Sequence, residues 1–415
     1  MKRQIVLAML STALFGWSCP GYAQTSWTVH PIAVIGDATP GGGTFAKFED
    51  RPNINEAGDV VFTATIAGGR APRGIFLASK GTLTQIVAAG DSTPDGGTFE
   101  TFRLGRSAPM KSGAALFLAT LAGGKAHKGI FRASKDTITK VVAEGDSITG
   151  GGTFDHILDD RPSGSDDGRV VFIAEAVTAT PQEGSSRTSK KGIFTEAQGR
   201  FTKVVGLGDP TPLGGAFHNF GRPAINERGE VVFSAAIKGG STLESLFHVA
   251  GGKITPVVRV GDRSPGGGTF KEFEGVWINN RGDISFRAFM EGSKAAIESY
   301  VVSQGSVAKV AAAEAPLPDG RIFDLAFGRP MMNDRGEMAF KAKLHGGQRG
   351  GGKEGIFATA GEAISKVVVD VDPTPVGGTF GTLTPPFLSH AGAIAFRASI
   401  VGGRTSEGIF VATQR

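Results

Sequence analysis

The chain has 415 residues, of which 40% are hydrophobic and 20% are charged, with one cysteine and a formal net charge of +5. A chain of this length can bury a large core, and a single cysteine excludes an internal disulfide and a multi-cysteine metal site. The basic residues form no block, so the charge gives no support for nucleic-acid binding.

Residues 1–23 have the organisation of a secretory signal peptide. Two basic residues start the segment, an apolar run follows, and Gly21 and Ala23 provide the small residues of a cleavage site. The apolar run is short for a membrane span, and a lipoprotein signal at Cys19 is disfavoured by the bulky Trp17 before it. We expect cleavage after Ala23, a periplasmic or secreted protein, and a soluble mature chain without a membrane span.

Seven copies of one motif fill the rest of the chain. Each copy begins with Gly-Asp or a variant and continues through a Gly-rich hinge into Thr-Phe, as in Gly36-Asp37 followed by Gly43-Thr44-Phe45. The copies start near residues 36, 90, 145, 208, 261, 314 and 371. Within a copy, runs rich in Val, Ile, Phe and Thr are bounded by Gly, Pro, Asn and Asp, which is typical of β-strands. We count four strands per copy, a to d in chain order.

Four antiparallel strands in each of seven copies predict an all-β protein, a seven-bladed β-propeller that spans 24–415 as a single domain. The seventh copy reaches only strand c, at Gly408–Val411. Val29–Ile35 precedes the first Gly-Asp in the way that Leu83–Ala89, a strand d, precedes the second. We therefore predict that the N-terminal strand closes the last blade, with Pro31 on the free edge of an outermost strand. We expect this closed ring to be a monomer.

Several a–b hairpins share the pattern Asn-x-x-Gly-x-x-Ala-Phe. The pattern is complete at 333–340, and its variants lie at 55–62, 226–233, 279–286 and 389–396. Asn and Gly tolerate left-handed backbone, so the pattern predicts tight turns in preference to metal binding or recognition. The sequence resembles a bacterial family of exported tandem-repeat proteins named for this motif, whose members often carry a C-terminal surface anchor. The resemblance implies no established activity, and we recognise no anchor after Phe410.

Arginine recurs at the entry of strand a, and Gly275 and Pro385 take its place in two copies. The arginines are Arg51, Arg106, Arg161, Arg222 and Arg329. Strand a lies nearest the axis of a propeller, so these residues can form a cationic ring that receives an anionic ligand. The interpretation that we favour is pairing with the turn aspartate of the next copy. The predicted pairs are Arg51 with Asp91, Arg106 with Asp146, Arg161 with Asp209, Arg222 with Asp262, and Arg329 with Asp372.

Copy three departs most from the repeat. His156, Asp159 and Asp160 precede Arg161, and the b–c loop is lengthened across 178–191. In a propeller the d–a and b–c loops share one face, so this loop can overhang His156. Acid–base or metal chemistry there is one hypothesis, and a solvated, variable loop is the interpretation that we favour. No zinc-type histidine pair or serine-hydrolase elbow occurs elsewhere, and we predict no metal and no cofactor.

These features predict an exported binding or scaffold protein that contacts a small anionic ligand, a glycan or a protein on its d–a/b–c face. The candidate ligand-binding residues are Arg51, Arg106, Arg161, Arg222, Arg329, His156, Asp159 and Asp160. The competing hypothesis is an exported propeller enzyme, a glycan hydrolase or lyase with an axial site near the copy-three loop. Such an enzyme needs two converging carboxylates or an acid–base pair. We favour binding because the sequence offers no catalytic motif.

Overall fold

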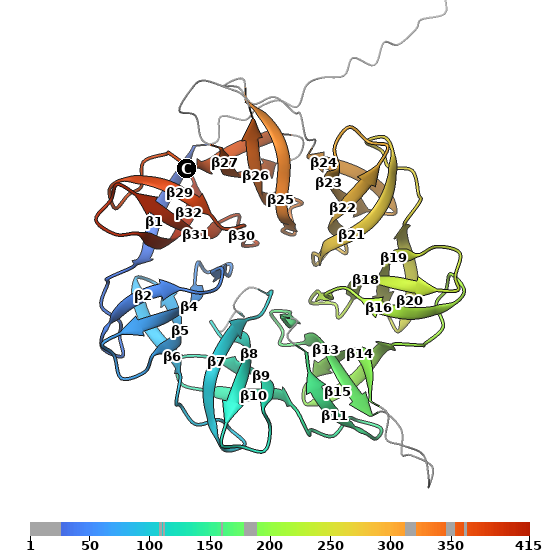
Figure 1. The fold of residues 1–415 in the computed structure, drawn as a ribbon, viewed down its shortest axis with the longest axis horizontal. Helices are drawn as coiled ribbons and strands as arrows, with labels where there is room; N and C mark the ends of the chain where they lie inside the picture. The colour runs from blue at the N-terminus through green and yellow to red at the C-terminus, as the bar shows by residue number, and fades with distance from the viewer. Residues whose placement is uncertain are drawn as a thin grey trace, which may run out of the picture.

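The computed structural model describes residues 26–107, 110, 113–158, 161–177, 189–311, 321–345, 353–360 and 363–415, with only the backbone of 311 and 324–329. The predicted signal peptide lies outside these residues. The regular structure in them is β-strand, arranged as seven antiparallel sheets around a central axis (Figure 1). The predicted all-β, seven-bladed propeller is confirmed. No helix that is long and apolar enough to span a membrane occurs in the described residues.

The first four blades follow one another along the chain. Blade 1 comprises β2 (Thr44–Phe48), β3 (Asn53–Ile54), β4 (Val60–Ala67), β5 (Arg73–Ser79) and β6 (Thr82–Ala88). Blade 2 comprises β7 (Thr98–Leu104), β8 (Ala115–Ala122), β9 (Lys128–Ala133) and β10 (Ile138–Ala143). Blade 3 comprises β11 (Thr153–Ile157), β12 (Ser163–Gly164), β13 (Val170–Val177), β14 (Lys190–Ala197) and β15 (Arg200–Gly206). Blade 4 comprises β16 (Ala216–Phe220), β17 (Ala224–Ile225), β18 (Val231–Lys238), β19 (Glu244–Ala250) and β20 (Lys253–Arg259).

The last three blades complete the ring. Blade 5 comprises β21 (Thr269–Ile278), β22 (Ile284–Glu291), β23 (Ile297–Ser303) and β24 (Ser306–Ala311). Blade 6 comprises β25 (Ile322–Met332), β26 (Met338–His345), β27 (Glu354–Ala360) and β28 (Ala363–Val369). Blade 7 comprises β29 (Thr379–Leu383), β30 (Phe387–Leu388), β31 (Ile394–Val401), β32 (Glu407–Gln414) and β1 (Trp27–Val34). In blades 1, 3, 4 and 7 the inner strand a is interrupted, so two short segments pair with strand b.

The N-terminal strand β1 is strand d of blade 7, as predicted. It pairs antiparallel with β32, and Figure 1 shows the blue strand at the outer edge of the red blade. Pro31 pairs with Phe410, and a bulge follows before Ala33 pairs with Ile409. The β5–β6 pair of blade 1 has its bulge at the same step. The shared bulge shows that β1 matches the other outer strands in register as well as in position.

Three aromatic rings form the centre of every blade, one each from strands a, b and c. They are Phe45, Phe62 and Phe76 in blade 1, and their counterparts are Phe99, Phe117, Phe131; Phe154, Phe172, Phe194; Phe217, Phe233, Phe247; Phe270, Phe286, Tyr300; Phe323, Phe340, Phe357; and Phe380, Phe396, Phe410. The rings of strands b and c stack with interplanar angles of 20–29°. The strand a ring meets the strand c ring edge-on at 4.8–5.1 Å. This repeated cluster is the core of each blade.

The Asn-x-x-Gly turns also join neighbouring blades. Asn279 accepts backbone N–H bonds from Arg281 and Asp283 through Oδ1, which closes its own turn. Its Nδ2 donates to the Asn333 carbonyl of blade 6 at 3.1 Å. Asn226 donates in the same way to the Asn279 carbonyl at 3.0 Å, and Asn333 donates to the His390 carbonyl at 3.4 Å. The predicted turn role is confirmed, and each amide adds a bond to the next blade.

We expect Asn279→Ala to lower the free energy of unfolding by about 2–3 kcal/mol, because a buried and a part-buried backbone N–H group and one carbonyl lose their partners. Chemical denaturation measures this loss. Ser389→Ala is the matched control, since Ser389 holds the equivalent turn through one bond to Ala393. The control should cost about 1 kcal/mol. Equal losses in the two variants would contradict a role for Asn279 between blades.

Candidate functional site

Two of the predicted arginines reach across the propeller axis. Arg106 of blade 2 is 6% exposed and donates to the carbonyls of Arg222 at 3.4 Å and Val276 at 3.0 Å, in blades 4 and 5. Arg161 of blade 3 forms an ion pair with Asp50 of blade 1. None of these blade pairs is adjacent in the ring, so both side chains extend into the central space. They brace non-neighbouring blades and fill part of the central space.

Arg51 lies in the same cluster and makes no hydrogen bond or ion pair with any described residue. Its side chain is half-buried. Burial lowers the pKa of Arg51 to about 10, with smaller contributions from Arg161 and Arg222, while Asp50 acts in the opposite direction. The guanidinium is still charged at neutral pH. Among the described residues, the carboxylate that acts on it is Asp50, which already accepts bonds from Arg161 and the Leu104 N–H. This arrangement favours an anion at the axis.

The turn aspartates have a different role from the one that we favoured. Asp91, Asp146, Asp209, Asp262 and Asp372 each accept the backbone N–H of the residue three positions earlier, at 2.7–3.0 Å. Among the described side chains, no ion pair joins Arg51 to Asp91, Arg106 to Asp146, Arg161 to Asp209 or Arg222 to Asp262. The pairing prediction is wrong for these four pairs. Each aspartate caps the end of an outer strand d, whereas Arg106 and Arg161 bind groups of other, non-neighbouring blades. The side chain of Arg329 lies outside the described residues.

The copy-three residues are only partly described. His156 lies on β11 with 66% of its side chain exposed, and its Nδ1 is 3.7 Å from Glu144 Oε1 of blade 2. Asp159, Asp160 and residues 178–188 of the long b–c loop lie outside the described residues. The predicted acid cluster therefore stays a prediction. No group of three or more potential metal ligands occurs in the part of the chain that the structure describes.

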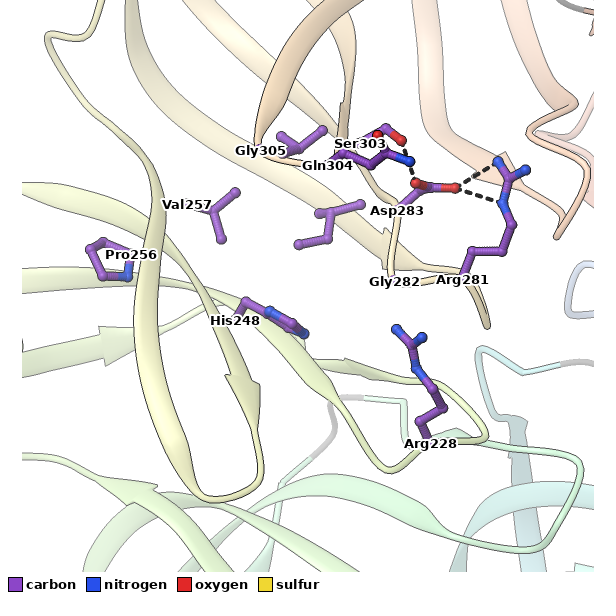
Figure 2. A pocket seen from close by; sticks show the side chains of 12 residues that line it. Arg228, His248, Pro256, Val257, Arg281, Gly282, Asp283, Ser303, Gln304 and Gly305 are labelled. Carbon is purple, nitrogen blue, oxygen red and sulfur yellow. Dashed lines mark hydrogen bonds and ion pairs between the residues drawn. The ribbon is translucent and has the colours of Figure 1, made fainter.

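A second candidate site, which the sequence analysis missed, is a groove between blades 4 and 5. Its cavity of about 600 Å³ lies beside the a–b and c–d turns of blade 5, on the face opposite to the predicted one. Figure 2 shows Arg228, His248 and Arg281 around the opening, with Pro256 and Val257 on one wall. A cavity of this size suits a small molecule. The available signal was the Asn-x-Arg-Gly form of the turn, which places an arginine beside the next blade.

The charges of the groove are largely paired. Arg228 Nη2 lies 2.6 Å from Glu230, and Arg281 donates through Nε and Nη2 to Asp283 Oδ2 at 2.9 and 2.7 Å. Although burial acts to raise it, hydrogen bonds from Ser303 and Arg281 help to hold the pKa of Asp283 below its usual value. The remaining guanidinium N–H groups, at Nη1 of both arginines and Nε of Arg228, have no partner among the described residues. They are available to an anionic group at the rim.

Comparisons with known proteins assign no activity to the chain. No curated protein matches the chain. Three solved structures are similar. A puromycin-hydrolyzing peptidase of Mycobacterium tuberculosis has 12% sequence identity and a TM-score of 0.48 over 90% of this chain. The polysaccharide lyase Uly1 has 11% identity and a TM-score of 0.44 over 94%, and the β-propeller domain of the Trilobed protease from Pyrococcus furiosus has 11% identity and a TM-score of 0.36 over 79%. The matches cover 55%, 99% and 100% of those chains, so this chain spans about half the length of the peptidase.

The family match extends over almost all of the sequence. Three overlapping segments, 22–159, 110–299 and 298–414, match one family, as expected for a repeat protein in which the same unit recurs. The chain therefore belongs to the family of unknown function DUF7453.

Proposed function

We propose that the protein is an exported binding protein that holds an anionic ligand at its axial arginines. The observation that carries the proposal is Arg51, a half-buried guanidinium without a partner among the described residues, next to Arg161 and Arg222. A protein gains no stability from crowding like charges in a partly buried place. A ligand with carboxylate, sulfate or phosphate oxygens would relieve that repulsion and satisfy the free donors.

The residues have separate roles in this proposal. Arg51 supplies a planar pair of donors to the ligand, and Arg161 presents its remaining N–H groups from the ion pair with Asp50. Arg222 adds positive charge. Arg106 acts as a brace, because its donors reach backbone carbonyls. Arg329, His156, Asp159 and Asp160 are proposed to complete the binding surface.

Arg51→Gln tests the site. We expect isothermal titration with citrate, inorganic phosphate and a glucuronate oligosaccharide to find one anion that binds the native protein, and binding to weaken at least tenfold in the variant. Arg51→Lys should recover part of the affinity, because it keeps the charge and loses the planar fork. Arg404→Gln, an exposed change in a b–c loop, is the control. Equal weakening in the control, or no binding of any of these anions, would contradict the proposal.

Two further measurements separate the alternatives. Anion binding that survives Arg51→Gln and falls in Arg281→Gln places the ligand in the groove between blades 4 and 5. Release of shorter products from the oligosaccharide supports the glycan hydrolase or lyase hypothesis.

Export is part of the proposal and rests on residues 1–23. Sequencing the N-terminus of the protein from the periplasm or medium should give Gln24 first.

A further inference from the structure

At two boundaries in the ring, the residue after the strand c phenylalanine reaches the a–b turn of the next blade. Between blades 2 and 3 this residue is Arg132, which donates through Nη2 to the Gly168 carbonyl and forms an ion pair with Glu196. Between blades 1 and 2 it is Leu77, whose Cδ2 would lie 3.5 Å from a Cβ atom on Gly113. A side chain of one blade therefore occupies the space beside the turn glycine of the next.

The groove between blades 4 and 5 lies at the same position of the repeat. Its lining includes His248, Gly282 and Val302. In the aligned repeats, these residues stand where blades 2 and 3 have the arginine, the turn glycine and the glutamate of the contact described above. The His248 side chain is shorter than arginine, and its Nε2 lies 3.7 Å from Glu230 Oε2 of its own blade. The space that an arginine fills between blades 2 and 3 is here a cavity of about 600 Å³.

Two guanidinium groups meet at the rim of this groove. A side chain at Gly282 would collide with Arg228 Nη2, so the head of Arg228 lies directly over the turn of blade 5. Arg281 is the residue before Gly282, and Figure 2 shows both guanidinium groups on the same side of the opening. The site therefore combines an arginine from each of two blades.

The rim has more free donors than free acceptors. Asp283 accepts through Oδ1 from Ser303 at 2.6 Å, and through Oδ2 from Arg281 and from the turn asparagine. Glu230 Oε2 accepts from Arg228 and from the asparagine of its own turn. Nη1 of both arginines has no partner among the described residues. The glutamate that receives a cation between blades 2 and 3 is replaced by a valine here, so the groove favours an anion.

The side of the groove opposite the arginines is apolar. Pro256 and Val257 form this wall and are half-buried (Figure 2). Ile284 and Val302, which are 3% and 8% exposed, also line the cavity. Contact with these side chains removes the apolar part of a ligand from water.

We propose that the groove between blades 4 and 5 binds a small carboxylate that carries an apolar body. The carboxylate accepts from the free N–H groups of Arg228 and Arg281, and the body lies against Pro256 and Val257. The ligand fills the space that Arg132 fills between blades 2 and 3. This site is separate from the axial arginines, and the proposal does not depend on the proposed function.

The test uses 3-phenylpropionate as the probe and isothermal titration of the full mature chain. Acetate has the carboxylate alone, and 3-phenylpropanamide has the apolar body without the charge. We expect each of them to bind at least about tenfold more weakly than the probe, because each lacks one of the two contacts. Equal affinity for the probe and either of these molecules, or no binding of the probe, would overturn the proposal.

Arg228→Gln and Arg335→Gln form a matched pair that locates the probe. Each arginine binds the glutamate two residues later, at 2.6 and 2.7 Å, and each lies over the turn glycine of the next blade. Arg335 belongs to blade 6 and does not line the groove. We expect the affinity to fall about tenfold in Arg228→Gln and to stay unchanged in Arg335→Gln. Equal losses in the two variants, or a loss in Arg51→Gln in place of Arg228→Gln, would overturn this proposal.

The double variant His248→Arg, Val302→Glu gives blades 4 and 5 the contact of Arg132 with Glu196. We expect it to bind the probe at least about tenfold more weakly and to melt no lower than the native protein, because the new arginine fills the groove and has its own carboxylate. Native affinity in the double variant would overturn the proposal. Binding of citrate or phosphate at the axial arginines should be unchanged, which separates this test from that of the proposed function.

Discussion

Deletion of residues 24–35 is expected to destabilise blade 7 and, through it, the closed ring. The deletion removes β1 and the residue after it, and with them Trp27, Val29, Ile32 and Ile35, which pack on the buried core of blades 1, 6 and 7. Burial of four such side chains contributes on the order of 5 kcal/mol. The expected result is a large fall in the midpoint of chemical denaturation, with faster proteolysis of blade 7 than of blades 3 and 4.

Adding the missing strand as a peptide provides the control. The exposed edge of β32 offers unpaired backbone groups to any strand that matches its register. A peptide of residues 24–36 should therefore restore the midpoint, and a version with Ile32 and Ile35 changed to Asp should not. A truncated chain with the native midpoint would show that β1 contributes little to closure.

The blades were predictable because their signals are local. Turn residues such as Gly58 and Gly282 hold positive φ, and the strand runs between them follow short-range rules. The closure was predictable because β1 stands before Gly36 as every other outer strand stands before its own turn. Neither inference depends on the direction of a long side chain. This explains why repeat spacing alone gave the correct number and order of sheets.

The contacts of the arginine side chains were not predictable from the same repeat spacing. Arg106 and Arg161 lie seven residues after the strand a phenylalanine, Arg51 six and Arg222 five, so the side chains leave strand a at different heights. A long side chain near an axis can reach any blade, as Arg106 reaches blades 4 and 5. The periodic pairing with aspartate failed because the aspartates satisfy backbone N–H groups close to them in sequence. Each aspartate therefore binds a backbone N–H three residues earlier and not an arginine of another repeat.

The second large effect is expected from Phe62→Ala in the aromatic cluster of blade 1. Phe62 is fully buried, and its ring centroid lies 5.6–5.7 Å from those of Phe45, Phe48 and Phe76. Truncation removes the transfer free energy of the ring and leaves a cavity among rings that cannot close around it, at a cost of about 3–5 kcal/mol. Chemical denaturation and the near-ultraviolet circular dichroism of the native state measure the loss.

Leu243→Ala is the control for this change. The Leu243 side chain is 77% exposed, so its truncation should lower the free energy of unfolding by less than about 0.5 kcal/mol. Phe62→Leu should lower the free energy of unfolding less than Phe62→Ala, since leucine fills part of the cavity without restoring the ring contacts. The same cluster recurs in every blade, and blades 1 and 7 share one continuous core. Suppose that hydrogen exchange shows a loss of protection in blade 1 and unchanged protection of β31 and β32. This result would show that the blades unfold independently. A loss of protection in both blades would show that the closed ring unfolds as a unit there.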